Sequence, residues 1–192
     1  MDKLPFLISI PHGGTKIPEE VASQVCLSAK DLFEDSDSFT REIYGIRGDV
    51  LALVETDIAR AIVDLSREIS DRPPTNPDGI VKSKTCHSKP VYAPDSFPSE
   101  LTIETLIQKY YDPYHKKIQD VLENPTGIKL ALDCHTMEPV GPAISPDQGK
   151  ERPNTRKYRH KNPLTQVHPE SGVTSPTPAL PEPEGFGCNA LA

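Results

Sequence analysis

The sequence lacks any apolar stretch that approaches the roughly 20 residues of a membrane-spanning helix. Positive charge is also in short supply, because 21 lysines and arginines stand against 28 aspartates and glutamates, a formal net charge of −7 at pH 7. No basic tract interleaves with aromatic side chains, as a general nucleic-acid binder would require. The composition therefore favours a protein that binds neither membranes nor nucleic acid.

Closely spaced cysteine pairs are missing as well. The four cysteines, at positions 26, 86, 134 and 188, lie far apart and form no C-x-x-C motif. This spacing is typical of reduced thiols rather than of a disulfide framework, and it predicts a cytoplasmic protein. Residues 1–5 do not have the pattern of a secretory signal peptide, which agrees with that prediction.

Three familiar functional signatures are absent. The sequence has no P-loop, no glycine-rich dinucleotide-binding turn and no G-x-S-x-G nucleophile elbow. Interpretation as a nucleotide-binding protein or a serine hydrolase therefore lacks support.

The chain divides into two parts of different character. Residues 1–152 carry the apolar periodicity of a folded domain, whereas seven of the 40 residues in 153–192 are proline and no such periodicity continues. A segment of this kind cannot bury enough apolar surface to offset its ordering entropy. We therefore expect one α/β domain over 1–152 and a proline-rich, irregular tail over 153–192.

The periodicity of the first part suggests alternating strands and helices, which predicts an α/β sheet covered on both faces. Pro113, after Asp112, predicts either a restart of the last helix or a kink. The expected elements are strands over 5–10, 50–54, 59–65 and 128–132, helices over 19–30, 37–46 and 99–123, and a hairpin over 80–92.

Two histidines follow apolar, strand-like runs. His12 comes after residues 6–10 and is followed by two glycines, and His135 comes after residues 128–132. Ligands of α/β proteins bind where strands give way to loops. Two histidines so placed, with a carboxylate nearby, are what a catalytic zinc requires.

Acidic residues near the histidines supply the expected carboxylates. Asp133 lies two residues before His135, so both side chains point to one side of an extended chain, and one can support the other as a ligand. Asp133 as the cap of a strand end is the alternative. Asp35 and Asp37 are both candidates for the third ligand, although a solvated capping loop would explain this acidic stretch equally well.

Arginines supply a candidate anion site. Arg67 follows the expected strand 59–65, where its planar guanidinium could clamp a carboxylate. Arg60 and Arg72 are weaker candidates for the same role, and a surface salt bridge is the commoner fate of a single arginine.

Six short segments together resemble the N-formylglutamate amidohydrolase family and follow that family's order. The resemblance runs from residue 5 to about residue 152. The segments are residues 8–15, 34–40, 60–67, 71–74, 111–115 and 133–142.

The resemblance implies a zinc carboxypeptidase-like fold, a mixed, mostly parallel sheet flanked by helices. It also implies zinc-dependent hydrolysis of the formyl amide of N-formyl-L-glutamate, giving formate and glutamate in histidine breakdown. Other N-acyl amino acids would fit the same chemistry.

The resemblance assigns roles to individual residues. His12, His135 and Asp37 correspond to ligands of one zinc ion, with Asp35 as the alternative to Asp37. Arg67 corresponds to the arginine for a substrate carboxylate, with Arg60 as a second substrate-binding residue and Asp64 as the positioning neighbour of Arg67. Apart from the resemblance, Asp133 could serve as general base.

The chain also departs from the family. Ser66 stands before Arg67 where many members have asparagine, and members continue past this chain's end with further strands and a late glutamate suited to act as general base. We therefore expect a C-terminally incomplete domain, with a frameshift or faulty gene model as the explanation for 153–192. Two alternatives to an active enzyme remain: an inactive relic of the family, and an interaction protein that works through its proline-rich tail.

Overall fold

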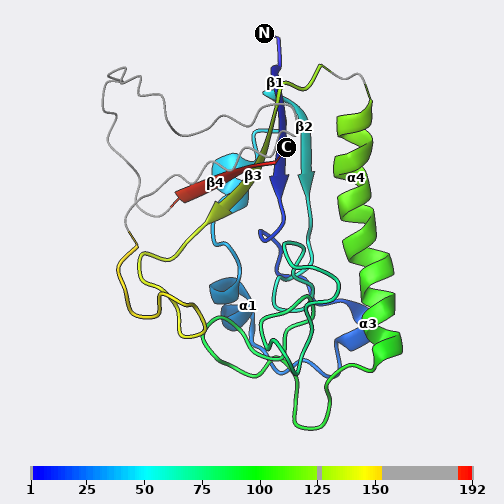
Figure 1. Cartoon of the computed structure of the whole chain (residues 1–192), viewed down its shortest axis with the longest axis vertical. Helices are drawn as coiled ribbons and strands as arrows, with labels where there is room; N and C mark the ends of the chain where they lie inside the picture. Colours follow the sequence, from blue (N-terminus) through cyan, green and yellow to red (C-terminus); the bar gives the residue numbers. More distant parts are fainter. Residues whose placement is uncertain (1, 125–126, 153–185, 192) are drawn as a thin grey trace.

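A four-stranded sheet with the strand order β2-β1-β3-β4 forms the centre of the fold (Figure 1). The computed structural model describes residues 2–124, 127–152 and 186–191, the last range as backbone. β1 pairs in parallel with both β2 and β3, and β3 pairs antiparallel with β4. The mixed, mostly parallel α/β sheet is confirmed. The strands are β1 (Leu4–Ile10), β2 (Val50–Glu55), β3 (Leu130–Thr136) and β4 (Phe186–Leu191).

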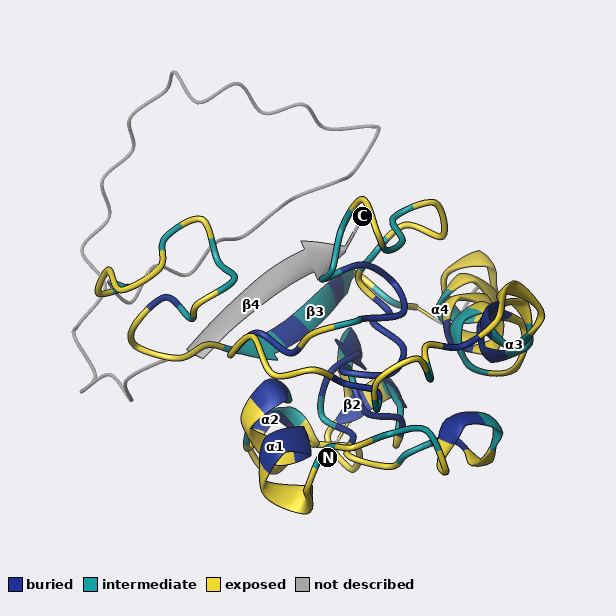
Figure 2. Ribbon diagram, turned by 90° about the horizontal axis from the view of Figure 1, so that it is seen from below, coloured by how far each residue is buried: buried dark blue, intermediate teal, exposed yellow. Residues whose placement is uncertain are grey.

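β1 is central because both of its faces are apolar. Leu7 is fully buried in the larger core cluster, whereas Ile8 and Ile10 are buried in a second cluster with Val50. Side chains alternate across a strand, so the run from Leu7 to Ile10 covers both faces, as in parallel sheets buried on both sides. Figure 2 shows buried residues along β2 and β3 and on the inner sides of the helices.

Helices flank the sheet, and α2 (Thr40–Tyr44) is shorter than the helix expected over 37–46. None of the helices in the described ranges has the length and apolar character needed to cross a bilayer. The helical elements are η1 (Glu19–Val21, a 3-10 helix), α1 (Ala29–Asp35), α2 (Thr40–Tyr44), α3 (Glu100–Leu106), η2 (Ile107–Tyr111, a π-helix) and α4 (Asp112–Glu123).

The helix expected over 19–30 is wrong. Only the 3-10 turn η1 lies near its start, and α1 begins after Ser28, which forms a capping box with Asp31. After a turn at residues 22–24 the chain is extended, since Val25 bridges Tyr92 and the Cys26 amide donates to the Val91 carbonyl at 3.0 Å. A capping box fixes a helix start more strongly than a weak apolar pattern does.

The strand over 59–65 is also wrong, and of the hairpin expected over 80–92 only a short antiparallel contact forms. Residues 59–65 form a buried turn, in which the Val63 amide donates to the Ala59 carbonyl at 3.1 Å. Within 80–92 the expected hairpin is reduced to one isolated bridge between Lys84 and Pro90. A short apolar run reports burial, and burial alone does not distinguish a strand from an interior loop.

The helical segment over 99–123 is confirmed. Ser99 caps α3, the π-helical turn η2 follows, and α4 begins at Asp112 with Pro113 in its first turn. Proline lacks an N–H, so its place is the first turn of a helix, and the wider π turn before it absorbs the change of hydrogen bonding. The helix therefore continues through Pro113 by way of the π turn, and the restart expected from a cap at Asp112 is wrong.

Part of the expected tail has a described backbone. Residues 186–191 form β4, at the edge of the sheet beside β3. The expectation of an irregular segment otherwise falls on residues 153–185 and 192, which lie outside the described residues.

The burial of β1 leads to a stability prediction. Leu7→Ala should lower the free energy of unfolding by about 2–5 kcal/mol, because it removes a fully buried side chain from the core. Leu101→Ala, at a residue that is 79% exposed, is the matched control and should cost less than about 0.5 kcal/mol. Urea unfolding of the two variants measures both values, and equal losses would contradict the placement of β1.

Candidate metal centre and active site

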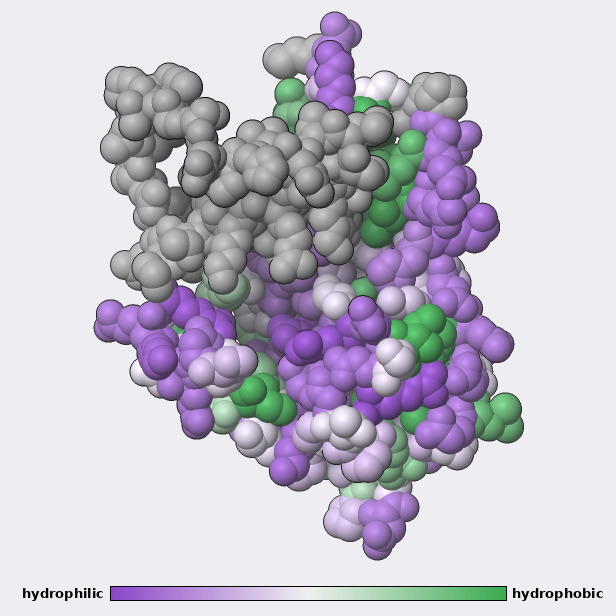
Figure 3. Space-filling model, viewed as in Figure 1, coloured by the Kyte–Doolittle hydropathy of each residue, from purple (hydrophilic) through white to green (hydrophobic). Residues whose placement is uncertain are grey.

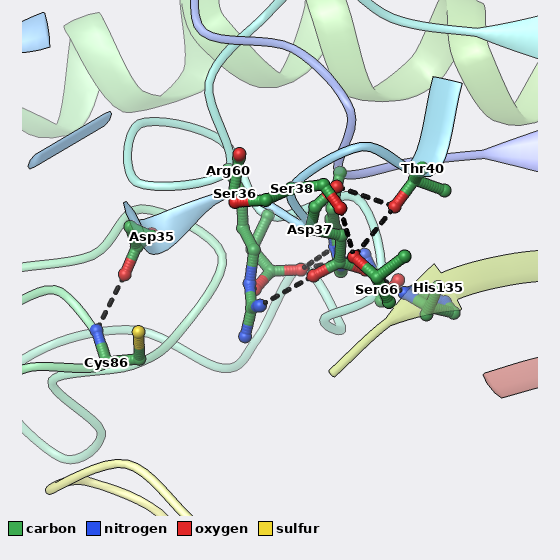
Figure 4. A network of polar contacts seen from close by, with 12 residues as sticks. Asp35, Ser36, Asp37, Ser38, Thr40, Arg60, Ser66, Cys86 and His135 are labelled. Atoms are coloured by element: carbon green, nitrogen blue, oxygen red, sulfur yellow. Dashed lines mark hydrogen bonds and ion pairs between the residues drawn. The ribbon is translucent and has the colours of Figure 1, made fainter. Parts of the chain in front are cut away.

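Three side chains from separate parts of the chain converge at the carboxyl edge of β1 and β3. One ligand atom each of His12, Asp37 and His135 lies within 4.8 Å of the other two. The Asp37 Oδ2 atom is 2.7 Å from His135 Nδ1 and 3.5 Å from His12 Nδ1. The structure thus brings together the three residues that the sequence suggested as ligands, and Figure 4 shows Asp37 beside His135.

His12 reaches this position because the chain turns sharply after β1. A Cβ atom on Gly14 would lie 2.3 Å from the carbonyl carbon of Asp57, so only glycine allows this close approach. The His12 carbonyl also accepts a hydrogen bond from the Asp37 amide at 3.1 Å. The turn therefore sets the imidazole and ties its backbone to the acidic segment.

Asp37 lies just beyond the end of α1, where Ser36 is the C-cap. Phe39 follows with a φ of 63°, a left-handed conformation that is uncommon for a residue other than glycine. The Thr40 hydroxyl donates to the Asp37 carbonyl at 2.6 Å. These features turn the chain from α1 into α2 and hold the Asp37 carboxylate towards the two histidines.

His135 lies within β3, one residue before its end, so it is a strand residue rather than the loop residue that the sequence suggested. Its neighbour Thr136 donates from its hydroxyl to the Ser38 carbonyl at 2.8 Å and lies 3.0 Å from the Thr40 hydroxyl. These contacts join β3 to the segment that carries Asp37, and no sequence pattern predicted them.

The second nitrogen of each imidazole contacts a further carboxylate. His12 Nε2 is 2.8 Å from Asp64 Oδ1, and His135 Nε2 is 3.1 Å from Asp133 Oδ2. Carboxylates in such positions fix the ring orientation of metal-binding histidines. Asp133 is itself held by the Ser9 hydroxyl at 2.8 Å, which lies 2.6 Å from the Tyr114 hydroxyl.

The two acidic candidates for the third ligand point to different partners. Asp35, the last residue of α1, accepts a hydrogen bond from the Cys86 amide at 2.6 Å (Figure 4). It lies outside the group formed by His12, Asp37 and His135. The N-cap of α2 is Phe39, so the expectation that one of the acids caps this helix is wrong.

The arginines separate in the same way. Arg60 contacts Asp37 through Nη1 at 3.2 Å and Asp64 through Nε at 3.3 Å. Arg67 pairs with Asp78, and both Arg60 and Arg67 line the pocket at the metal-ligand candidates. Arg72 instead pairs with two glutamates of α3, the surface role that the sequence left open.

Neighbouring charges and hydrogen bonds set the pKa values of the buried groups Asp37 and His135. Burial favours the neutral form of Asp37, but the nearby charges of His12 and Arg60 and the hydrogen bond from His135 outweigh it and hold the Asp37 pKa well below its ordinary value. Burial likewise lowers the pKa of His135, but hydrogen bonds to Asp133 and Asp37 raise it to about 10. On binding zinc, each imidazole would lose the proton from the nitrogen that becomes the metal ligand.

The residues fit a divalent cation. His12 Nδ1 is buried and has no hydrogen-bond partner in the described part of the chain. Buried polar atoms of this kind are rare unless something satisfies them. Two imidazole nitrogens and a carboxylate oxygen are a ligand set of catalytic zinc sites, which keep a fourth position open.

Sequence reasoning missed Lys82 and its partner Asp78. Lys82 has no exposed surface, and its ammonium lies 2.6 Å from Asp78 Oδ1 and 3.3 Å from Asp64 Oδ2. The one available signal was Lys82 directly after the apolar pair Ile80 and Val81. Figure 3 shows many hydrophilic residues on the described part of the face that it draws, and a surface of this kind is where lysines usually lie.

A His–Asp–His group at the carboxyl edge of a mostly parallel sheet is typical of metal-dependent hydrolases. The chain belongs to the N-formylglutamate amidohydrolase family, whose family model matches residues 4–168. The resemblance found in the sequence is therefore confirmed.

Curated relatives and a solved structure agree with this membership. The chain is 26% identical over 141 residues to the N-formylglutamate deformylases of Pseudomonas putida and Pseudomonas aeruginosa, a match that covers 70% of this chain and 52% and 53% of theirs. The chain thus spans about half the length of these relatives. The crystal structure of N-formylglutamate amidohydrolase from Ralstonia eutropha JMP134 matches with a TM-score of 0.58 and 19% identity, over 71% of this chain and 55% of that chain, which supports the fold.

The convergence of three ligand atoms predicts which side chains bind metal. His12→Ala, Asp37→Ala and His135→Ala should each weaken zinc binding by more than about 100-fold, because outer-shell changes alone cost 10- to 100-fold. His87→Ala, at a histidine outside the group, should leave the affinity unchanged. Competition with a chelating dye measures these values, and unchanged binding in the first three variants would remove them as ligands.

Proposed function

We propose that this chain carries the zinc site of an amidohydrolase that cleaves N-formyl-L-glutamate to formate and glutamate. The observation that carries the proposal is the convergence of His12, Asp37 and His135. The buried His12 Nδ1 atom lacks a hydrogen-bond partner among the described residues. Family membership and the names of the two Pseudomonas relatives support the substrate. The proposal extends to histidine breakdown and to the cytoplasm, with other N-acyl amino acids as alternative substrates.

Zinc bound to these three residues would lower the pKa of a water molecule towards about 7 and polarise the carbonyl of the substrate amide. The carboxylates behind the histidines prepare for this role. Asp64 and Asp133 each take one imidazole nitrogen, which leaves both Nδ1 atoms turned towards Asp37.

Arg67 is the proposed contact for a substrate carboxylate. A guanidinium carries five N–H donors, so its bond to Asp78 through Nη2 leaves donors for a second carboxylate. Its side chain is 35% exposed and lines the pocket that also contains His12 and His135. Arg60 borders the same pocket and would add positive charge there.

Asp133 is the proposed general base. One oxygen accepts a hydrogen bond from Ser9, and the other lies beside His135 Nε2, so Asp133 has a fixed orientation. As a base, Asp133 would accept a proton from the attacking water and later return it to the leaving nitrogen. A later residue of the full-length relatives is the competing candidate, as the family resemblance implies.

One observation favours a second function, a metal-binding chain without turnover. The matched region covers only 52% and 53% of the Pseudomonas relatives, so residues needed for the chemical step could lie in their remaining half. The hypothesis of an interaction protein that works through its prolines concerns residues 153–185, outside the described residues.

Formate release distinguishes the first two functions. Purified chain loaded with zinc should release formate from N-formyl-L-glutamate, and a chelator should abolish the release until zinc is restored. Zinc binding without formate release would favour the non-catalytic function. Absence of zinc binding would contradict both.

Arg67 provides a further prediction. Arg67→Ala should raise KM about 10- to 100-fold with a smaller change in kcat, because it removes a charged hydrogen bond worth about 1.5–3 kcal/mol. Arg72→Ala, at the arginine paired with α3, is the control and should change KM less than about twofold. If the chain does not turn over, calorimetric affinity for N-formyl-L-glutamate replaces KM. Equal effects of the two substitutions would exclude Arg67 from the substrate site.

A further inference from the structure

We propose that Lys82 is a positioning residue of the metal site, which fixes Asp64 in place so that Asp64 holds the ring of His12. The inference rests on the proposed zinc site. It concerns a residue that neither borders the pocket nor touches the three ligands.

Lys82 is a buried cation among carboxylates. Its side chain has no exposed surface, and its Nζ atom lies 2.6 Å from Asp78 Oδ1, 3.3 Å from Asp64 Oδ2 and 3.9 Å from Asp35 Oδ2. A charge removed from water is tolerated only when it is paired. The charge of Lys82 is therefore balanced by the three carboxylates around it, and not by solvent or by a ligand.

Asp64 divides its two oxygens between different tasks. Oδ1 lies 2.8 Å from His12 Nε2 and accepts the Ser66 amide at 3.0 Å. Oδ2 faces cations, with Lys82 Nζ and Arg60 Nε both at 3.3 Å. The two cations at Oδ2 thus fix the plane of the Asp64 carboxylate, and Oδ1 faces the ring of His12.

Lys82 differs from the two arginines near Asp64. Arg60 and Arg67 are 21% and 35% exposed and border the pocket, so their contacts can change when substrate binds. Lys82 does not border the pocket in the described part of the chain, so its contact with Asp64 persists whatever the pocket holds. Lys82 therefore holds Asp64, and through it the ring of His12, whether or not the pocket is occupied.

Among the described residues, no such cation lies behind the other histidine. Asp133, which contacts His135, instead accepts a hydrogen bond from the Ser9 hydroxyl, which is itself in contact with the Tyr114 hydroxyl. The two sides of the proposed metal site are therefore supported by independent contacts. A substitution at Lys82 should affect the side of His12 and not that of His135.

A double-mutant cycle on zinc affinity tests this separation. Lys82→Met should weaken zinc binding about 10- to 100-fold, as losses of outer-shell partners do. Adding Lys82→Met to Asp64→Asn should weaken binding no further, since Lys82 acts through Asp64. Adding it to Asp133→Asn, the matched control, should multiply the two effects. Zinc affinity within twofold of the unsubstituted chain, or multiplied effects with Asp64→Asn, would overturn the proposal.

A second measurement needs neither zinc nor a substituted lysine. In the metal-free chain, the ¹⁵N resonance of the Lys82 ammonium should shift on Asp64→Asn and stay in place on Asp133→Asn. A Lys82 resonance that ignores Asp64→Asn overturns the proposal even if Lys82→Met does not fold. A chain that binds no zinc but shows the expected shift would contradict the proposed function and leave the role of Lys82 supported.

Discussion

The Asp37 carboxylate is the group on which the rest of the site depends. Its Oδ2 atom lies 2.7 Å from His135 Nδ1 and 3.5 Å from His12 Nδ1, and it is almost fully buried. A buried carboxylate is tolerated only with compensating charge and hydrogen bonds. The two imidazoles, Arg60 and the turn through Phe39 all serve this requirement, whether or not a cation occupies the space between them.

Two further carboxylates, those of Asp64 and Asp133, lie behind the two histidines. Asp64 and Asp133 hold the outer nitrogens of His12 and His135, and the two carboxylates are held by different kinds of group. Cations hold Asp64, whereas the Ser9 hydroxyl, itself in contact with Tyr114, holds Asp133. The groups that orient the histidines lie on β1, α4 and the buried loop after β2. The packing of these elements therefore positions the site.

The sequence predicted His12 and His135 because a histidine that follows an apolar run is a local signal, and the parallel pairing of β1 with β3 brings both to one edge. The choice between Asp35 and Asp37 depended on the residue at which α1 ends, which propensity locates only within a few residues. The apolar run 59–65 was taken for a strand, since periodicity reports burial rather than backbone shape. Lys82 escaped notice because a lysine in a sequence predicts surface.

The central claim is that His12, Asp37 and His135 together bind one zinc ion. X-ray absorption at the zinc edge, on purified chain loaded with one equivalent, tests it most directly. The expected spectrum shows two imidazole nitrogens and a carboxylate oxygen at about 2.0–2.2 Å. Sulfur ligation at about 2.3 Å, or a zinc ion surrounded by water alone, would contradict it.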